Sequence, residues 1–336
     1  MDAGIGSINY KGTSVSGVYN NGSATSQINF RGNHDLGGGM KADFRVETDW
    51  NTVTNSGNTG AKNADGTVAA ASSFGNGEIR TGLATNFGRF DLGAVNYTTL
   101  DATLTGQPFG TAIGSGFRTL YVNDARGTSA VRADNALKYT SPAFNGLSLT
   151  LYNSNKQTKS GTGVATDTNF STSYGALDQV GIKETGVKYS NGPINAVYVQ
   201  LKQDNAGVGT GTTVDTVSTL AANYTFGASK VMLLNQTNKN DSNAKNNKTT
   251  TVSGTHTIGA FTLMLQSGNT QNISGSKSNF TGIGADYALS KMANIYFRSE
   301  KNTNGAGSVA AALTPSTISG TGTNFDRSAL GLRVAF

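Results

Sequence analysis

The 336-residue chain contains no cysteine, only four prolines and two histidines, and a single tryptophan. Without cysteine, neither a disulfide scaffold nor a Cys-ligated metal site can form. Two histidines leave few groups for metal hydrolysis or a nucleophilic triad, and the sequence has no HExxH, GxSxG or P-loop pattern. We therefore expect a protein that is not an enzyme and that needs neither a cofactor nor a metal.

Long hydrophobic runs are also missing. No stretch of about 18 consecutive apolar residues occurs, which excludes a transmembrane helix. The start of the chain lacks the basic, hydrophobic and small-residue regions of a secretory signal, and its first residues resemble the inside of a strand. Hydrophobic residues make up only 36% of the sequence, which is compatible with a barrel whose interior faces water.

The charge balance is mildly basic. The 26 basic and 20 acidic residues give a formal net charge of +6 and are interspersed along the chain. A nucleic-acid-binding domain would instead cluster its basic residues on one face. We expect no nucleic-acid partner, whereas a small positive excess suits anionic solutes.

What the sequence does contain is a repeated alternation of apolar and polar residues. Between Gly39 and Trp50, the apolar residues Met40, Ala42, Phe44, Val46 and Trp50 alternate with five charged ones. This period of two predicts a strand with one apolar face. One soluble strand would give the same pattern, but the pattern recurs around Leu220, Phe261, Ile283 and Leu330.

The connections between these segments alternate in length. Short turns rich in Gly and Asn alternate with long polar stretches, such as Asn51 to Phe74 and Asn302 to Asn324. Aromatic residues such as Phe87, Tyr224 and Phe261 lie near the short turns, as a girdle at one lipid interface requires. We predict one closed antiparallel transmembrane β-barrel of about 16 strands over residues 1–336.

The longest such stretch near the centre runs from Thr98 to Asp134 and has no strand or helix pattern. Unstructured loops longer than about 15 residues are usually lids or disordered. We expect this loop to fold into the barrel and to narrow it mostly by bulk, through Phe109, since residues 102–117 carry no charge. Its candidate site residues are Asp101, Gln107, Pro108, Phe109, Gly110, Arg118, Asp124 and Arg126.

Strand geometry also predicts which charges line the interior. Arg45, Arg80 and Lys138 lie at similar distances from their nearest short turns, so we expect them at one height as a basic wall, with Arg132 above. Such a wall favours anions. Alternatively, Arg45 and Arg80 are structural and pair across neighbouring strands with Glu47, Asp43 or Glu78. The other charges predicted to line the interior are Lys41, Asp43, Glu47 and Glu78.

Five segments resemble the trimeric general porins of the Gram-negative outer membrane, of the type with an Asp-Leu-Gly-Gly-Gly turn. They are residues 30–42, which contain Asp35-Leu36-Gly37-Gly38-Gly39, residues 86–93, residues 137–142, residues 284–291 and the closing residues 331–336. The resemblance covers nearly the whole chain. Members of the family open with several more residues of the first strand, so we expect the start of that strand to be missing before Met1.

This resemblance implies a passive diffusion channel for small hydrophilic solutes, anionic or neutral, in the outer membrane. It implies a homotrimer that contacts the lipid bilayer and lipopolysaccharide, and it makes Thr98 to Asp134 the third external loop, which constricts the pore. It also implies that the barrel-insertion machinery recognises Phe336. Gln107-Pro108-Phe109-Gly110 lacks the acid of the similar Pro-Glu-Phe-Gly segment in many relatives.

Two alternatives remain. An extracellular adhesin or β-solenoid would share the Gly, Asn, Thr and Ser composition, but a solenoid should have a fixed short repeat, and we find none. A substrate-specific channel on the same barrel stays open, because selectivity depends on the width that the folded loop leaves.

Overall fold

The computed structural model describes residues 1–10, 13–50, 52, 74–117, 120–121, 131–154, 181–204, 216–239, 247–272, 275, 277–303 and 324–336. Within these ranges the chain forms one helix, α1 (Thr98–Thr105), and a single sheet of 17 strands. The strands are β1 (Asp2–Tyr10), β2 (Thr13–Asn20), β3 (Gln27–Gly37), β4 (Met40–Asp49), β5 (Ile79–Thr85), β6 (Gly88–Asn96), β7 (Arg132–Thr140), β8 (Leu147–Ser154), β9 (Gly181–Asn191), β10 (Ile194–Asp204), β11 (Thr216–Phe226), β12 (Ser229–Lys239), β13 (Asn247–Ile258), β14 (Phe261–Asn272), β15 (Lys277–Ala288), β16 (Ala293–Thr303) and β17 (Phe325–Val334).

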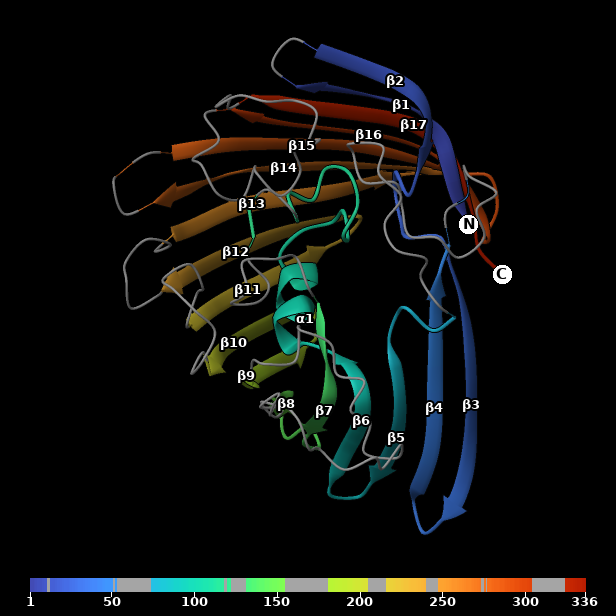
Figure 1. The fold of residues 1–336 in the computed structure, drawn as a ribbon, viewed down its shortest axis with the longest axis vertical. Helices are drawn as coiled ribbons and strands as arrows, with labels where there is room; N and C mark the ends of the chain where they lie inside the picture. Colours follow the sequence, from blue (N-terminus) through green and yellow to red (C-terminus); the bar gives the residue numbers. More distant parts are fainter. Residues whose placement is uncertain are drawn as a thin grey trace, which may run out of the picture.

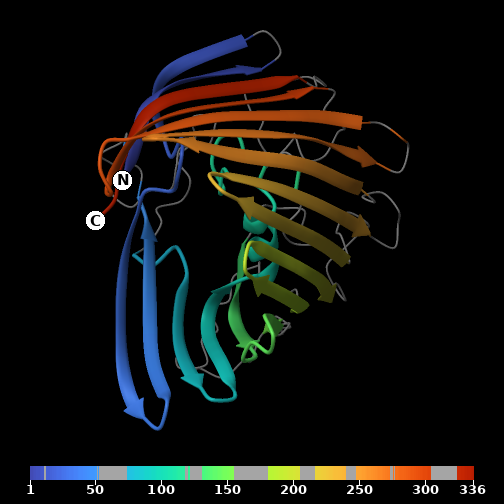
Figure 2. The same cartoon turned by 180° about the vertical axis from the view of Figure 1, so that it is seen from behind.

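All strand pairs are antiparallel, and from β3 to β17 each strand pairs with its neighbours in sequence. β1 lies between β17 and β2. The predicted all-β antiparallel fold is therefore confirmed, and the described strands agree with the predicted number of about 16. The sheet curves strongly but stays open between β2 and β3 (Figures 1 and 2), so the predicted closure is not observed in the described strands.

The five segments with the clearest alternation form β4, β11, β14, β15 and β17. In β15, every second residue from Ser278 to Gly284 is buried, while Ile283 between them is 48% exposed. We call the convex face, which carries the exposed apolar side chains, the outer face, and the concave face the inner face. Exposed apolar residues of the outer face include Phe30, Phe44, Leu92, Leu149, Leu220, Leu233, Val252, Leu265, Phe297 and Leu330.

Aromatic pairs lie beside the short turns. Phe261 and Tyr287 have ring centroids 4.6 Å apart, next to a turn in which Gly259 has φ of +60°. Only glycine adopts such a left-handed conformation without strain. Phe90 and Tyr139 form a similar pair at 5.0 Å. The aromatic side chains thus gather at one end of the sheet, as the sequence predicts.

The prediction that Thr98 to Asp134 has no helix is wrong, because α1 occupies Thr98–Thr105. No helix in the described ranges has the length and apolar character needed to cross a membrane. α1 lies on the inner face of the sheet (Figure 1), and the residues around it form the protein's buried core. The long polar stretches Asn51 to Phe74 and Asn302 to Asn324 lie largely outside the described residues.

Candidate functional site

The helix α1 is held at its N-terminus by Glu184 of β9. The backbone N–H groups of Thr98 and Thr99 donate to the Glu184 carboxylate at 2.5 and 2.9 Å, and the Thr99 hydroxyl donates at 2.6 Å. Tyr97, the N-cap residue, supplies no side-chain cap. Free N–H groups at a helix start favour an acceptor with negative charge. Glu184, on strand β9, therefore supplies the N-terminal cap that the residues next to α1 in sequence do not provide.

Asp101 joins α1 to two lysines of the sheet. Its Oδ2 lies 2.5 Å from Nζ of Lys188 and 3.4 Å from Nζ of Lys138, which come from β9 and β7. Burial would raise the pKa of Asp101, but the two ammonium groups outweigh it and hold that pKa below its usual value. The carboxylate is thus ionised near neutral pH, and it fixes the helix to the wall.

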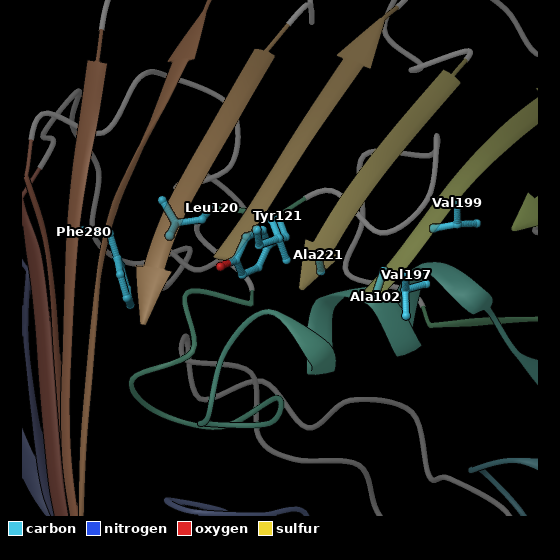
Figure 3. Close-up of a cluster of buried hydrophobic side chains, with 8 residues drawn as sticks. Ala102, Leu120, Tyr121, Val197, Val199, Ala221 and Phe280 are labelled. Atoms are coloured by element: carbon cyan, nitrogen blue, oxygen red, sulfur yellow. The ribbon is translucent and has the colours of Figure 1, made fainter. Parts of the chain in front are cut away.

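Apolar packing continues this attachment. Ala102, Leu120 and Tyr121 belong to one buried cluster with Val197 and Val199 of β10 and with residues of neighbouring strands (Figure 3). The remaining members of this buried cluster are Ala221, Leu234 and Phe280. Residues 98–117 and 120–121, which we call the inner segment, therefore cover the inner face of β9 to β15.

Gln107 and Phe109 shape the middle of the inner segment. The Gln107 side chain accepts from the N–H of Phe109 at 2.6 Å and donates to the carbonyl of Gly110 at 2.6 Å, closing a compact turn. The Phe109 ring is only 2% exposed and lies 5.8 Å from Cζ of Arg298. Because its ring is buried against the wall, Phe109 anchors the segment and does not supply the free bulk that the sequence suggested.

The end of the inner segment is tied to β14 and β16. The N–H of Gly114 donates to Glu300 at 2.7 Å, and the Gln266 amide donates to the carbonyl of Ser115 at 3.0 Å. Tyr121 shares a hydrogen bond of 3.0 Å with Thr251. Burial raises the pKa of Tyr121, so this hydroxyl stays protonated and keeps its hydrogen bonds. The inner segment is fixed along its whole described length.

A row of three arginines lies on β3, β4 and β5. Arg31 pairs in register with Arg45, and Arg45 with Arg80. Residues directly opposite in an antiparallel pair point to the same face, and the neighbours Phe30 and Phe44 are exposed on the outer face. The three arginines therefore project from the inner face, whereas the main contacts of α1 are with β9 to β12.

Carboxylates neutralise much of this row. Arg45 forms ion pairs with Glu47 and, at 2.7 Å, with Glu78. Arg80 lies 2.5 Å from Asp43 and 3.0 Å from Asp91. Arg89 pairs with the same two aspartates. The cross-strand pairing weighed as the structural alternative is therefore present. Exposed Arg31 forms no ion pair with any described residue.

Lys138 and Arg132 lie apart from the arginine row. Lys138 is opposite Asp91 in register, and its Nζ donates to the carbonyl of Asn96 at 3.0 Å as well as contacting Asp101. Arg132 donates to the carbonyl of Asn76 at 2.8 Å. Lys138 is on the inner face and holds α1 through Asp101, whereas Arg132 binds the backbone just before β5.

The other predicted site residues are scattered. Lys41 is exposed near the turn between β3 and β4, Pro108 is half-buried, and Phe336 is 99% exposed at the chain end. Arg118, Asp124 and Arg126 lie outside the described residues. The inner-face charges that sequence reasoning missed are Arg31, Arg89, Asp91, Glu184, Lys188, Asp286, Arg298, Glu300 and Arg327.

Alternation could have located several of the missed charges. In β16, Ile295 and Phe297 are exposed on the outer face, whereas Tyr296, Arg298 and Glu300 between them are buried. The same period of two that identified β4 is present there. This alternation predicts on which face of the sheet each charged side chain lies, but it does not predict which residue forms an ion pair with it.

A family comparison decides what kind of protein this sheet belongs to. The sequence profile of the family described as Gram-negative porin matches residues 1–327. The chain belongs to the Gram-negative porin family. This porin is 31% identical over 230 residues to outer membrane porin protein 32 of Delftia acidovorans, covering 67% of this chain and 58% of that protein.

A second relative is an outer membrane porin protein of Bordetella pertussis, 31% identical over 199 residues that cover 57% of this porin and 45% of the relative. The matched regions thus span about half the length of these relatives. Among solved structures, the anion-selective porin from Comamonas acidovorans has a TM-score of 0.74 at 23% identity, covering 100% of this chain and 97% of that chain. A trimer form of OmpT from Vibrio cholerae has a TM-score of 0.60 at 15% identity, covering 98% and 97%.

Proposed function

We propose that this porin is a passive diffusion channel for small hydrophilic solutes and that it catalyses no reaction. The observation that carries the proposal is the division of one curved sheet into an apolar outer face and a charged inner face. An exposed apolar band on the outside is suited to lipid, and a polar interior is suited to water. Membership of the porin family supports the same function and the location in the outer membrane.

The route for solutes runs between the inner segment and the wall formed by β3 to β7. The inner segment, which begins the loop from Thr98 to Asp134, occupies the interior beside β9 to β15 and leaves the arginine row uncovered. On the segment, Leu104 is 41% exposed and Thr111 is exposed. On the segment side, residues 102–117 carry no charge and Asp101 lies at the start, whereas the other side carries the ion-pair network. In this proposal the barrel closes in the membrane and the loop constricts it.

The channel prefers anions in this proposal. Arg31 has no carboxylate partner in the described part of the chain, and Lys138 and Lys188 share the single carboxylate of Asp101. The formal net charge of +6 acts in the same direction. Fixed positive charge in a narrow aqueous passage offsets the cost of bringing an anion through. The residues proposed to form this basic wall are Arg31, Arg45, Arg80, Lys138 and Arg132.

The proposed assembly is a homotrimer in contact with the lipid bilayer and lipopolysaccharide. A trimer form among the similar solved structures supports this assembly. The fully exposed Phe336 at the end of the last strand is proposed to be the residue that the barrel-insertion machinery recognises.

Planar-bilayer recordings of the purified protein test this function. We expect stepwise conductance, and in a potassium chloride gradient a reversal potential with the sign of an anion-preferring channel. A clear cation preference would overturn the charge argument. Failure of the refolded protein to conduct at all would reject the channel itself.

A further inference from the structure

The inner segment rests, at Ile113, on strands from both ends of the chain. Ile113 belongs to one buried cluster with Tyr296 of β16 and Ala329 of β17. Tyr19 of β2 packs against the same cluster. The N–H of Ile113 donates to the carbonyl of Gly22, in the connection between β2 and β3, at 3.3 Å. The surroundings of Ile113 therefore differ from those of α1, whose main contacts are with β9 to β12.

A chain of polar contacts holds the neighbouring Gly114. Its N–H donates to one carboxylate oxygen of Glu300 at 2.7 Å, and the other oxygen lies 2.6 Å from Nε of Arg327. Arg327 in turn donates to the hydroxyl of Tyr19 at 3.2 Å. We call residues 112–114 the tip. The seat of the tip consists of Tyr19, Gly22, Tyr296, Glu300, Arg327 and Ala329.

Asp2 of β1 holds two parts of this seat together, and it is only 1% exposed. Its Oδ1 accepts from the N–H of Gly22 at 2.9 Å and from the hydroxyl of Tyr296 at 2.6 Å. Its Oδ2 accepts from the N–H groups of Ser23 and Ala24, both at 2.9 Å, and from the Ser23 hydroxyl at 2.6 Å. None of these donors belongs to the inner segment. The carboxylate therefore acts on the tip through the turn at Gly22 and through Tyr296.

The five donors around these two oxygens require a group that only accepts hydrogen bonds. An ionised carboxylate is such a group, whereas an amide of the same size carries an NH2 in place of one oxygen. In one orientation this NH2 would face the donors of Gly22 and Tyr296. In the other it would face those of Ser23 and Ala24. Because either orientation leaves buried donors without an acceptor, the turn at Gly22 depends on the carboxylate.

We propose that Asp2 is a positioning residue for the constriction: it fixes the turn at Gly22 and thereby seats the tip of the inner segment. This inference rests on the proposed function, in which the inner segment narrows the pore. The root of the segment, residues 98–102, is held separately by Glu184 and by the two lysines that contact Asp101. Loss of the carboxylate therefore releases the tip and leaves the root in place.

The test measures how fast a single thiol reacts with a maleimide in the folded protein in detergent. The chain has no cysteine, so Ala112→Cys places one thiol at the buried tip and Ala102→Cys places one at the buried root. Added to each, Asp2→Asn should raise the reaction rate at the tip about tenfold or more, because local opening exposes the thiol. The reaction rate at the root should stay unchanged. A general loosening of the fold would instead raise both rates.

A second variant changes the seat without changing charge. A Cβ at Gly22 would lie 2.5 Å from Oη of Tyr296, so Gly22→Ala should push the turn away and expose the tip as Asp2→Asn does. Its matched control is Gly17→Ala on β2, where a Cβ meets nothing within 4 Å. The control for the lost charge is Asp326→Asn, which alters an exposed carboxylate on the outer face of β17. Both controls should leave the reaction rate at the tip unchanged.

Three results would overturn the proposal. They are an unchanged reaction rate at the tip in Asp2→Asn and Gly22→Ala, equal acceleration at tip and root, and acceleration by Asp326→Asn as large as that by Asp2→Asn. If Asp2→Asn does not fold, Gly22→Ala and its control Gly17→Ala decide the matter by the same rates.

Single-channel recordings separate this inference from the proposed function. In a protein that conducts, Asp2→Asn should add brief closures, because the released tip moves within the passage, and Asp326→Asn should not. Conductance of the unmodified protein with an unchanged tip rate in Asp2→Asn overturns the positioning role and leaves the channel function standing. Selective exposure of the tip in a protein that does not conduct supports the positioning of the tip by Asp2 and rejects the channel.

Discussion

Arg45 and Arg80 stand opposite each other on β4 and β5, and both face the same carboxylate oxygen. Oε2 of Glu78 lies 2.7 Å from Nη1 of Arg45 and 3.9 Å from Nε of Arg80. The carboxylate separates two cations that would otherwise repel each other. It also reduces the positive field that the pair projects into the interior. The ion selectivity of this wall therefore depends on how far the positive charge of its arginines exceeds the negative charge of the carboxylates paired with them.

Glu78→Gln should increase anion preference, because it removes one negative charge from between Arg45 and Arg80 and keeps the side-chain volume. The reversal potential in a potassium chloride gradient should move toward that of an anion channel. Lys291→Gln, which removes one charge in a short turn, is the control for loss of a charge outside the arginine row and should leave the potential unchanged. A shift of the Glu78 variant toward cations would contradict the pairing.

The double variant Arg45→Ala, Arg80→Ala should have the opposite effect. It leaves Glu47 and Glu78 without the cation that they share, and Arg89 alone to neutralise Asp43 and Asp91. We expect the reversal potential to cross zero and take the sign of a cation-preferring channel. An anion preference that survives this change would place the selective charges elsewhere, such as at Arg31.

Acid should release α1 from the sheet through Asp101. Its pKa in the folded state is held below the unfolded value of about 3.9 by Lys138 and Lys188, so its contribution to stability is fully present above that value. The contribution is lost as pH falls through the folded pKa. Thermal unfolding from pH 7 to pH 2 should therefore depend less on pH in Asp101→Asn, which should also be less stable at pH 7. Identical pH profiles for the two proteins would exclude this role.

Glu184→Ala should loosen the start of α1. The change leaves the N–H groups of Thr98 and Thr99 and the Thr99 hydroxyl without their acceptor, at a cost of about 1–3 kcal/mol. Limited proteolysis should cut the inner segment faster, and single-channel current should become noisier. The neighbouring Thr185→Ala, whose side chain is exposed on the outer face, should behave as the unmodified protein.

Gly282→Ala should displace the inner segment from β15. A Cβ at this position would overlap the carbonyl oxygen of Gly114, which is backbone and cannot rotate away. Overpacking of this kind costs about 1–3 kcal/mol. A Cβ at Gly254 would meet only the carbonyl oxygen of Lys230, at 3.5 Å, so Gly254→Ala is the matched control. Equal melting temperatures and equal conductance for the two variants would mean that Gly114 does not lie against Gly282.

Much of the sheet could be predicted from residue alternation. The pattern from Met40 to Trp50 gave both the strand β4 and the inward direction of Arg45, because side chains alternate strictly between the two faces of a strand. The helix α1 could not be found in this way. Its residues Thr98, Thr99 and Thr103 are β-branched and favour helix only weakly, and its cap comes from Glu184, distant in sequence.

The sequence also did not predict which charged residues form ion pairs with one another. Alternation with Phe90 and Leu92 places Asp91 on the inner face of β6, but it does not indicate that Asp91 contacts Arg80 and Arg89. The uncharged segment around Phe109 predicts that this side chain narrows the pore by bulk. It is buried because Gly284 and Arg298 leave room for its ring on the wall. Which side chains meet depends on strand register and on the path of the inner segment, and neither is encoded locally.

Because β1 pairs with β17, the sheet cannot finish folding before the whole chain has been synthesised. Asp2 is opposite Arg333 and Tyr10 is opposite Phe325, so the first strand finds this partner only after the last one has been synthesised. Contacts so distant in sequence slow folding. Until then, β1 has a free edge, and apolar side chains such as Ile5 and Leu330 lack their membrane environment. The unfinished chain therefore exposes an unpaired strand edge and apolar side chains to water until β17 has been made.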